Sequence, residues 1–501
     1  MARARAERLI LFGPWAVGLG CGSWVCGLVG LWVSTLYAAR QSGAGDKISG
    51  MAESETPPDR AEAPKPLPPQ PSRGEQFYRH GLRRVTGRDP GEAHRAASPL
   101  ELFYDLTFAT AIAVASSQLA AGVVGGYGFR ATMAFGLTFV AIVWAWVGHT
   151  WYSASFSVDD WLERVLVLVQ MVGVLIVAIG IPVAFESIEH TDRLDNRIMI
   201  AGYVVLRLAL VALWVRLWFG DPALKGIATV NIFAVAAAQT GWVWYGFAQL
   251  DMTLGTAVVA MAPLWILDLG APVWAQRKAL RIVEGGAPWN PAHISERYSL
   301  FALLCIGETL VGTLSSASEI QAVEGWNAEA IAALGIGVLT SFGLWWAYYL
   351  IPSEPVLEVH RERVVGWSFL HVPLLASIAA TGAGLHMLGA ALTEPDVVPA
   401  TTGTLALAVP VSLFTGCIIA TRLHLTRGRF SVVSGLGLAL PLVGVGVSYA
   451  GAPLWWSLAL VLASPTAIIV FYEAGGWRGL TRQLDVALAS AEAPANPPEV
   501  K

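Results

Sequence analysis

Twelve apolar stretches, each about as long as a membrane-spanning helix, follow a proline-rich segment of this chain, and one more precedes it. A helix needs roughly 20 apolar residues to cross a bilayer core. Hydrophobic residues make up 55% of the chain and charged residues only 14%. This composition differs from that of a typical soluble domain, in which more residues are charged. The sequence therefore predicts an all-α polytopic integral membrane protein with twelve core helices. The predicted spans are 97–121, 128–152, 163–185, 198–219, 225–247, 252–274, 296–317, 328–350, 364–391, 401–422, 430–449 and 453–473.

The parts outside this core differ in composition. Residues 1–40 begin with three arginines and continue with an apolar run too long for a signal-peptide core, which predicts a signal anchor or extra span. Cleavage, N-out insertion and a later translation start remain open for this N-terminal hydrophobic segment. Residues 41–96 are rich in proline, alanine and charge and predict a disordered linker, and residues 475–501 predict a disordered cytoplasmic tail.

Basic residues gather in the loops on one side of the predicted core, while the loops on the other side offer only Arg130, Arg193 and Arg197. By the positive-inside bias, both ends of the twelve-helix core face the cytoplasm. A signal anchor at residues 1–40 would place the linker on the opposite side, so the two expectations conflict. The basic loops contain Arg164, Lys225, Arg277, Lys278, Arg281, Arg361, Arg363, Arg427, Arg429, Arg478 and Arg482.

The core resembles itself at an offset near 200 residues. Matches in the same order predict two parallel six-helix repeats, residues 97–275 and 296–474, joined by a central cytoplasmic loop, residues 276–295. Repeats of this kind occur in transporters, although architecture alone does not fix function. The matched pairs are Glu163-Arg164 with Glu362-Arg363, Arg216 with Arg422, and Pro263 with Pro465.

Two acidic residues lie one turn apart at the start of the first core span. Ser98, Pro99 and Glu101 fit the cap, the first and the third positions of a helix, so Glu101 is expected to complete a capping box. Asp105 lies about 9 Å along the helix from Pro99, beyond the first turn, and needs another reason to be there. A functional carboxylate and a structural hydrogen bond to a neighbouring helix fit Asp105 equally well.

Two further carboxylates are expected inside the membrane. Glu308 lies about 18 Å from Glu296 along its helix, near mid-membrane, and is the best candidate for a proton-linked or ligand-binding group. Asp268 lies between Pro263 and Pro272, in a helix where kinking is expected. A structural role is the alternative for both acids.

Other polar residues in the spans complete the candidate site. His149 and His371 could shuttle protons, although an isolated histidine in an apolar helix is more often a structural donor. Arg207 is expected to pair with one of the acids, because an unpaired arginine in a span is costly.

Several kinds of site are not indicated by the sequence. It contains no GxxxxGK[ST], HExxH, GxSxG or GxGxxG motif, so no ATP-driven pump, motif-bearing hydrolase, catalytic residue or cofactor is predicted. Cys21, Cys26, Cys305 and Cys417 are isolated in apolar runs and predict neither a metal site nor redox chemistry. No feature indicates nucleic-acid binding.

Two segments resemble the signatures of a known family. The first is "ELFYDLTF" and the second, in the same order along the chain, is "ERYSLFALLCIGETL". The pair resembles the bacterial low temperature requirement protein A (LtrA) family over residues 96–474. The resemblance implies a polytopic protein of the bacterial inner membrane, named for a cold-growth phenotype, with no biochemical activity attached. The motif residues are Glu101, Phe103, Asp105, Phe108, Glu296, Arg297, Tyr298, Phe301, Gly307 and Glu308.

Three hypotheses for function follow. The first is a secondary transporter in which Asp105, Glu308 and Asp268 face a cavity between the repeats and act on a small solute or a proton. The second is a membrane protein that senses or organises the lipid bilayer without transport, in which the acids are packed against hydrogen-bond partners. The third is a membrane-embedded enzyme that lacks a recognisable motif.

Overall fold

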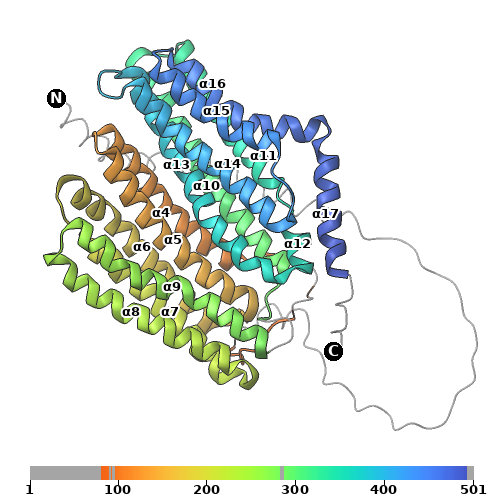
Figure 1. The fold of residues 1–501 in the computed structure, drawn as a ribbon. Helices are drawn as coiled ribbons and strands as arrows, with labels where there is room; N and C mark the ends of the chain where they lie inside the picture. Colours follow the sequence, from red (N-terminus) through yellow and green to blue (C-terminus); the bar gives the residue numbers. More distant parts are fainter. Residues whose placement is uncertain (1–80, 90–91, 93–95, 283–286, 493–501) are drawn as a thin grey trace, which may run out of the picture. The chain divides into compact units, whose positions relative to one another are not determined.

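The computed structural model describes residues 81–89, 92, 96–282 and 287–492 (Figure 1). The N-terminal hydrophobic segment, residues 1–40, and the linker up to residue 80 lie outside the described residues. The chain divides into two units at Gly81, and the account below concerns the unit Leu82–Lys501.

Within the described part, regular structure is helical throughout, and twelve helices are long and apolar enough to cross a membrane. These findings confirm the all-α prediction and fit a multi-pass membrane protein. The first helix group consists of α4 (Pro99–Val124), α5 (Gly128–Phe156), α6 (Trp161–His190), α7 (Arg197–Gly220), α8 (Lys225–Ala248) and α9 (Leu254–Ile282). The second group consists of α10 (Pro291–Glu324), α11 (Ala328–Tyr349), α12 (Ser353–Val359), α13 (Val364–Thr393), α14 (Ala400–Thr426), α15 (Val432–Tyr449) and α16 (Leu454–Phe471).

Helices pack in a similar order in each group. In the first, α4 contacts α5 and α6, and α6, α7 and α8 each contact the next helix along the chain. In the second, α10 contacts α11 and α13, and α13, α14 and α15 each contact the next helix along the chain. Figure 1 shows the two groups side by side, and α4 packs on α10 and α13 where they meet.

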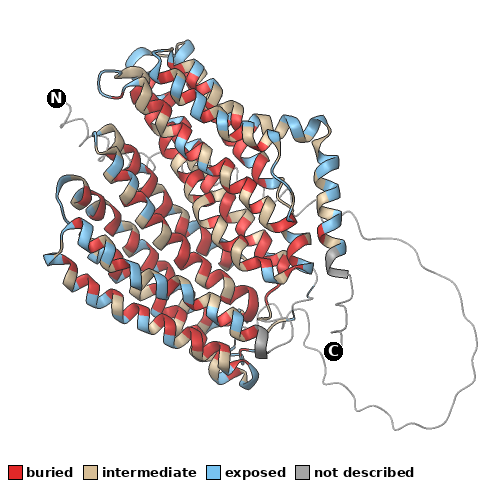
Figure 2. Cartoon of the chain, in the orientation of Figure 1, coloured by how far each residue is buried: buried red, intermediate tan, exposed pale blue. Residues whose placement is uncertain are grey.

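Buried residues run along the inward faces of the helices, while exposed residues gather on outward faces and connections (Figure 2). The largest hydrophobic cluster includes residues of both groups, such as Trp146 of α5 and Trp367 of α13. The α10–α13 interface is close at one point, because a Cβ on Gly312 would overlap the carbonyl oxygen of Gly382. Small residues allow such an approach where helices meet in a membrane.

The connection between the two groups is shorter than the predicted loop, residues 276–295. Helix α9 continues to Ile282, and α10 already begins at Pro291. The side chain of Asn290 caps α10 by accepting a hydrogen bond from the backbone N–H of His293 at 2.9 Å. An N-cap followed by proline marks the start of a helix. Polar residues follow this start, so a count of apolar residues placed the beginning of the span too late.

The C-terminal tail is not wholly disordered, so the prediction for residues 475–501 is wrong over Trp477–Glu492, which form helix α17. The side chains of Leu480, Leu484 and Ala487 recur at helical spacing and are shielded to a greater degree than their neighbours. Packing of this stripe on the core explains why a polar tail is helical.

The end of the linker also packs on the core. We call residues 82–89 the N-terminal strap. Its Val85 is buried, the backbone N–H of Arg83 donates to Asp160 Oδ2 at 3.0 Å, and Arg84 donates to the carbonyl oxygen of Gly220. The predicted disordered linker, residues 41–96, therefore does not extend through these residues.

Candidate functional site

Helix α4 begins with a complete capping box. The backbone N–H of Glu101 donates to Ser98 Oγ at 3.2 Å, and the backbone N–H of Ser98 donates to Glu101 Oε2 at 2.8 Å. With Pro99 in the first turn, this arrangement satisfies N–H groups that the helix itself leaves unpaired. It also fixes the direction of the Glu101 carboxylate.

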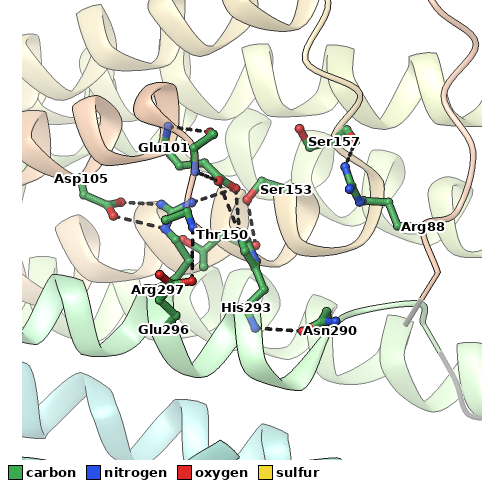
Figure 3. Close-up of polar contacts among 12 residues, drawn as sticks. Arg88, Glu101, Asp105, Thr150, Ser153, Ser157, Asn290, His293, Glu296 and Arg297 are labelled. Carbon is green, nitrogen blue, oxygen red and sulfur yellow. Dashed lines mark hydrogen bonds and ion pairs between the residues drawn. The ribbon is translucent and has the colours of Figure 1, made fainter. Parts of the chain in front are cut away.

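Arg297 of α10 lies between the two acids of α4 (Figure 3). Its guanidinium donates to both oxygens of Asp105, at 3.2 and 2.5 Å, and a third nitrogen lies 3.1 Å from Glu101 Oε1. The indole Nε1 of Trp146 donates to Asp105 Oδ1 at 2.6 Å. Asp105 and Arg297 are 1% and 0% exposed, so each charge depends on the other for compensation.

His293 extends the same cluster toward the start of α10. Its Nε2 lies 3.4 Å from Glu101 Oε1. Counted from the prolines that begin the helices, Glu101 and His293 are both third residues, and Asp105 and Arg297 are both seventh. Two acids on α4 thus face two bases at the same positions of α10.

Aromatic rings enclose the cluster on the side of the second signature segment. The ring of Phe301 stacks on Trp146 with centroids 4.2 Å apart, and Tyr298 meets the same indole edge to face at 4.8 Å. These contacts bring residues of both family motifs together around Asp105. Phe108 is buried and contacts Tyr104, whereas Phe103 is 56% exposed on the outer side of α4.

Polar contacts continue from α4 into the first helix group. The hydroxyl of Tyr104 donates to Gln170 Oε1 at 3.2 Å, and Gln170 Nε2 lies 3.3 Å from His149 Nδ1. The rings of Tyr104 and His149 also contact each other, with centroids 4.3 Å apart. His149 is therefore buried within a hydrogen-bonded layer of α4, α5 and α6.

A second buried ion pair lies deeper in the first group. Arg207 of α7 pairs with Asp268, which lies midway along α9, and the hydroxyl of Tyr203 donates to the other oxygen of Asp268 at 2.6 Å. The indole of Trp144 donates to the backbone oxygen of Asp268 at 3.1 Å. Arg207 and Asp268 are 1% and 0% exposed, respectively.

Two cavities lie on opposite sides of this ion pair. The α6 cavity is lined by Tyr203 and by residues in the earlier parts of α5, α7 and α9, and the α13 cavity by later residues of the same helices. On α9, Met261 and Trp265 line the first cavity and Pro272 and Gln276 the second, with Asp268 between them. On the antiparallel α8 the order is reversed, as it must be if the cavities are stacked across the membrane.

The other predicted site residues lie apart from both ion pairs. Glu308 is half-buried midway along α10 beside Gly382 of α13, and it forms no hydrogen bond or ion pair with a described residue. A Cβ on Gly307 would meet no atom within 4 Å. His371 is buried, with Nδ1 2.8 Å from the oxygen of Trp367.

The structure does not collect the three candidate acids in one place. Asp105 lies where the groups meet, Asp268 lies within the first group, and Glu308 lies in the second. None of these three acids lines the α6 or the α13 cavity, or a third cavity beside α17. Among the described residues, no group of three or more His, Cys, Asp or Glu side chains could hold a metal ion.

Several residues of the site were not singled out from the sequence. These residues are Trp146, His293, Gln170 and Tyr203. The spacing of four between His293 and Arg297, matching that between Glu101 and Asp105, was the available signal. For Gln170 and Tyr203 the sequence held only a polar group within an apolar run.

A third ion pair lies in the connection before α6. Asp160 caps α6 through the backbone N–H of Glu163 at 2.9 Å, and Arg216 donates to its other oxygen at 2.6 Å. Burial by itself would raise the pKa of the Asp160 carboxyl. Hydrogen bonds from Arg216 and from the backbone of Arg83 and Glu163 outweigh it and hold that pKa below its ordinary value.

Together, the fold and these buried ion pairs define a multi-pass membrane protein with charged groups fixed between its helices. The family described as bacterial low temperature requirement A protein (LtrA) matches residues 96–471. The chain belongs to this family, which confirms the resemblance of the two signature segments. It is also similar to an uncharacterized protein of Rhizobium meliloti (strain 1021), with 23% identity over 58% of this chain and 68% of the relative. No solved structure matches the chain.

Proposed function

We propose that this protein is a secondary transporter whose solute path runs through the first helix group. The observation that carries the proposal is the place of the Arg207–Asp268 pair between the α6 and α13 cavities. In alternating access, a site near mid-membrane opens to one side and then to the other. The ion pair and Tyr203 would form the partition between these two openings.

The chemistry of the partition supports this role. A buried ion pair is held by mutual compensation, so a proton or a charged group that competes for Asp268 would release Arg207. Tyr203 both bonds Asp268 and lines the α6 cavity. A solute entering that cavity would therefore reach Asp268 through a single side chain.

The walls of the cavities favour a small, mainly apolar solute with a few hydrogen-bonding groups. The linings are mainly apolar and include aromatic rings such as Trp242 in one cavity and Trp214 in the other. Amide side chains are present in both cavities, Asn196 in one and Asn231 and Gln276 in the other. Apolar walls with few polar groups are typical of small-molecule sites.

The finer architecture belongs to the same proposal. Parallel six-helix repeats are supported by the similar packing order of α4–α9 and α10–α16, with α12 as a short insertion. A location in the bacterial inner membrane, with both ends of the core in the cytoplasm, is supported by the placement of Arg and Lys. The strap and the start of α4 would then lie on the cytoplasmic side.

The partition can be tested without knowing the solute. In a full chain whose native cysteines are replaced by alanine, Leu137→Cys reports on the α6 cavity and Gln276→Cys on the α13 cavity. A membrane-impermeant maleimide, applied to vesicles of either orientation, should label the two positions from opposite sides. Asp268→Asn should make each position reactive from both sides, while Asp195→Asn, in an exposed pair with Arg197, should change nothing.

Transport itself is measured with the purified protein in liposomes, as solute-dependent movement of protons reported by a pH-sensitive dye. We expect at least one solute in a panel of small neutral and zwitterionic compounds to be transported by the wild type. Its transport should be abolished in Asp268→Asn and retained in Asp195→Asn. Labelling of both cysteines from one side, unchanged by Asp268→Asn, together with no flux over the panel, would falsify the proposal.

A further inference from the structure

A third cavity lies beside α17, away from the path proposed above. We call it the α17 cavity; it is enclosed by α11, α14, α15, α16 and α17. Most of its wall is apolar, including Ile418, Ile419, Ile468 and Phe471. One charged side chain, Arg422 near the end of α14, also lines it.

Arg422 has only neutral partners among the described residues. Its guanidinium donates to Gln483 Oε1 of α17 at 3.1 Å and to Ser434 Oγ of α15 at 3.5 Å. Its sequence counterpart, Arg216, instead pairs with the Asp160 carboxylate at 2.6 Å. The counter-charge built into the first group is therefore missing from the second, where a cavity lies beside the arginine.

The end of α14 and the connection to α15, which border the cavity, are positively charged. Residues 421–435 contain Arg422, Arg427 and Arg429 and no acidic residue, and both Arg427 and Arg429 are exposed. Arg422 lies in the last turns of a membrane-spanning helix, where an apolar wall meets the aqueous boundary. Basic pockets between helices at this depth suit anionic lipid head groups.

Helix α17 closes this cavity because the chain turns back after α16. Gly475 has φ 113°, a conformation that favours glycine, and it allows α17 to leave the direction of α16. Leu480 and Gln483 of α17 then line the cavity, with the amide of Gln483 on Arg422. A neutral amide occupies the position where an anion would bind more strongly.

We propose that the α17 cavity binds an anionic phospholipid, with its phosphate on Arg422 in place of Gln483 and an acyl chain along the apolar wall. The exposed Arg427 and Arg429 add attraction for the head group. Binding displaces the Gln483 amide from Arg422, so α17 is the element that responds to lipid. This site is separate from the solute path and does not depend on transport.

The test is native mass spectrometry of the purified full chain with added phosphatidylglycerol or phosphatidylethanolamine. The wild-type chain should bind the first phosphatidylglycerol about tenfold more tightly than phosphatidylethanolamine. Arg422→Gln should remove this preference. Arg478→Gln, which removes an exposed arginine of α17 outside the cavity, should keep it.

A second variant separates binding from any folding defect of Arg422→Gln. Leu480→Trp places a larger side chain on the apolar wall without changing charge, and it should also weaken phosphatidylglycerol binding. Phosphatidylglycerol binding that is as tight in both variants as in the wild type overturns the proposal. Inorganic phosphate should not compete with phosphatidylglycerol for the site. Equal competition by phosphate would assign the site to a soluble anion and overturn the proposal of a lipid site.

Discussion

Asp105 and Arg297, the seventh residues of α4 and α10, pair across the interface between these helices. The third residues, Glu101 and His293, also face each other, at 3.4 Å. Each helix thus carries two ionisable groups one turn apart, acidic on one and basic on the other. Neither helix could bury its pair alone, so the charges select the register in which α4 and α10 pack.

The first prediction concerns the cation of this cluster. Arg297→Gln leaves the Asp105 and Glu101 carboxylates buried together without their arginine. Removal of one partner of a buried pair costs about 3–5 kcal/mol, so a large fall in thermal stability is expected. The unfolding temperature of the purified protein in detergent measures it.

The matched control is Arg197→Gln, which breaks the Arg197–Asp195 pair at the surface. Its side chains are 51% and 32% exposed, so the expected loss of stability is small. Equal losses in the two variants would contradict a structural role for the Arg297 cluster.

The second prediction concerns the close contact of α10 with α13. Gly312→Ala places a methyl group on the carbonyl oxygen of Gly382 and must push the helices apart, at a cost of about 1–3 kcal/mol. Gly307→Ala, on the same helix, meets nothing within 4 Å and should be neutral or slightly stabilising. Thermal unfolding of both variants in the same detergent distinguishes them, and a loss in Gly307→Ala alone would contradict the packing.

The third prediction is a dependence of stability on pH at Asp160. Its pKa is lower in the folded protein than the value of about 3.9 in an unfolded chain, because Arg216 and two backbone N–H groups bind its carboxylate. The resulting stabilisation is complete above the unfolded pKa and is lost as the pH falls through the folded pKa.

Asp160→Asn keeps an N-cap but loses the negative charge that pairs with Arg216. This variant should therefore unfold at a lower temperature than the wild type at pH 7. The difference should shrink once the pH falls below about 4. Unfolding temperatures between pH 3 and pH 7 provide the measurement. A gap that stays constant down to pH 3 would speak against the charged interaction.

The fourth prediction concerns the N-terminal strap. A Cβ on Gly220 would overlap the carbonyl oxygen of Val85, so Gly220→Ala should displace residues 82–89 from the end of α7. Hydrogen exchange of a peptide covering the strap should become faster. Gly255→Ala, whose Cβ would meet nothing within 4 Å, should leave that exchange unchanged; protection that persists in Gly220→Ala would show that the strap is held elsewhere.

Helices were the predictable part of this molecule. Hydropathy located all twelve spans because a membrane requires a long apolar run, and Ser98, Pro99 and Glu101 marked the start of α4 from local chemistry alone. Two predictions were wrong: the start of α10, which lies at Pro291, and the disorder predicted over α17. In both cases the helical residues that were missed are polar and lie outside a continuous apolar run.

Pairings were the unpredictable part. The energetic cost of an unpaired charge in a membrane indicated that Arg207 needs an acid. The choice of Asp268 over Asp105 depends on how α7 and α9 are arranged around α8. Arg297 was predicted only as a motif residue. Its spacing from His293 matches that between Glu101 and Asp105, but a matching spacing does not show which two helices face each other. The separation of Asp268 from Asp105 and Glu308 likewise comes from tertiary packing.

The strap also constrains the order in which the chain can be assembled during synthesis. Residues 82–89 leave the ribosome before any of the twelve spans, yet they bind Asp160 before α6 and the Gly220–Asp221 end of α7. Their second anchor exists only after four spans have been made. Until then this segment must wait at the membrane surface, and its docking would mark the moment when α4 to α7 have come together.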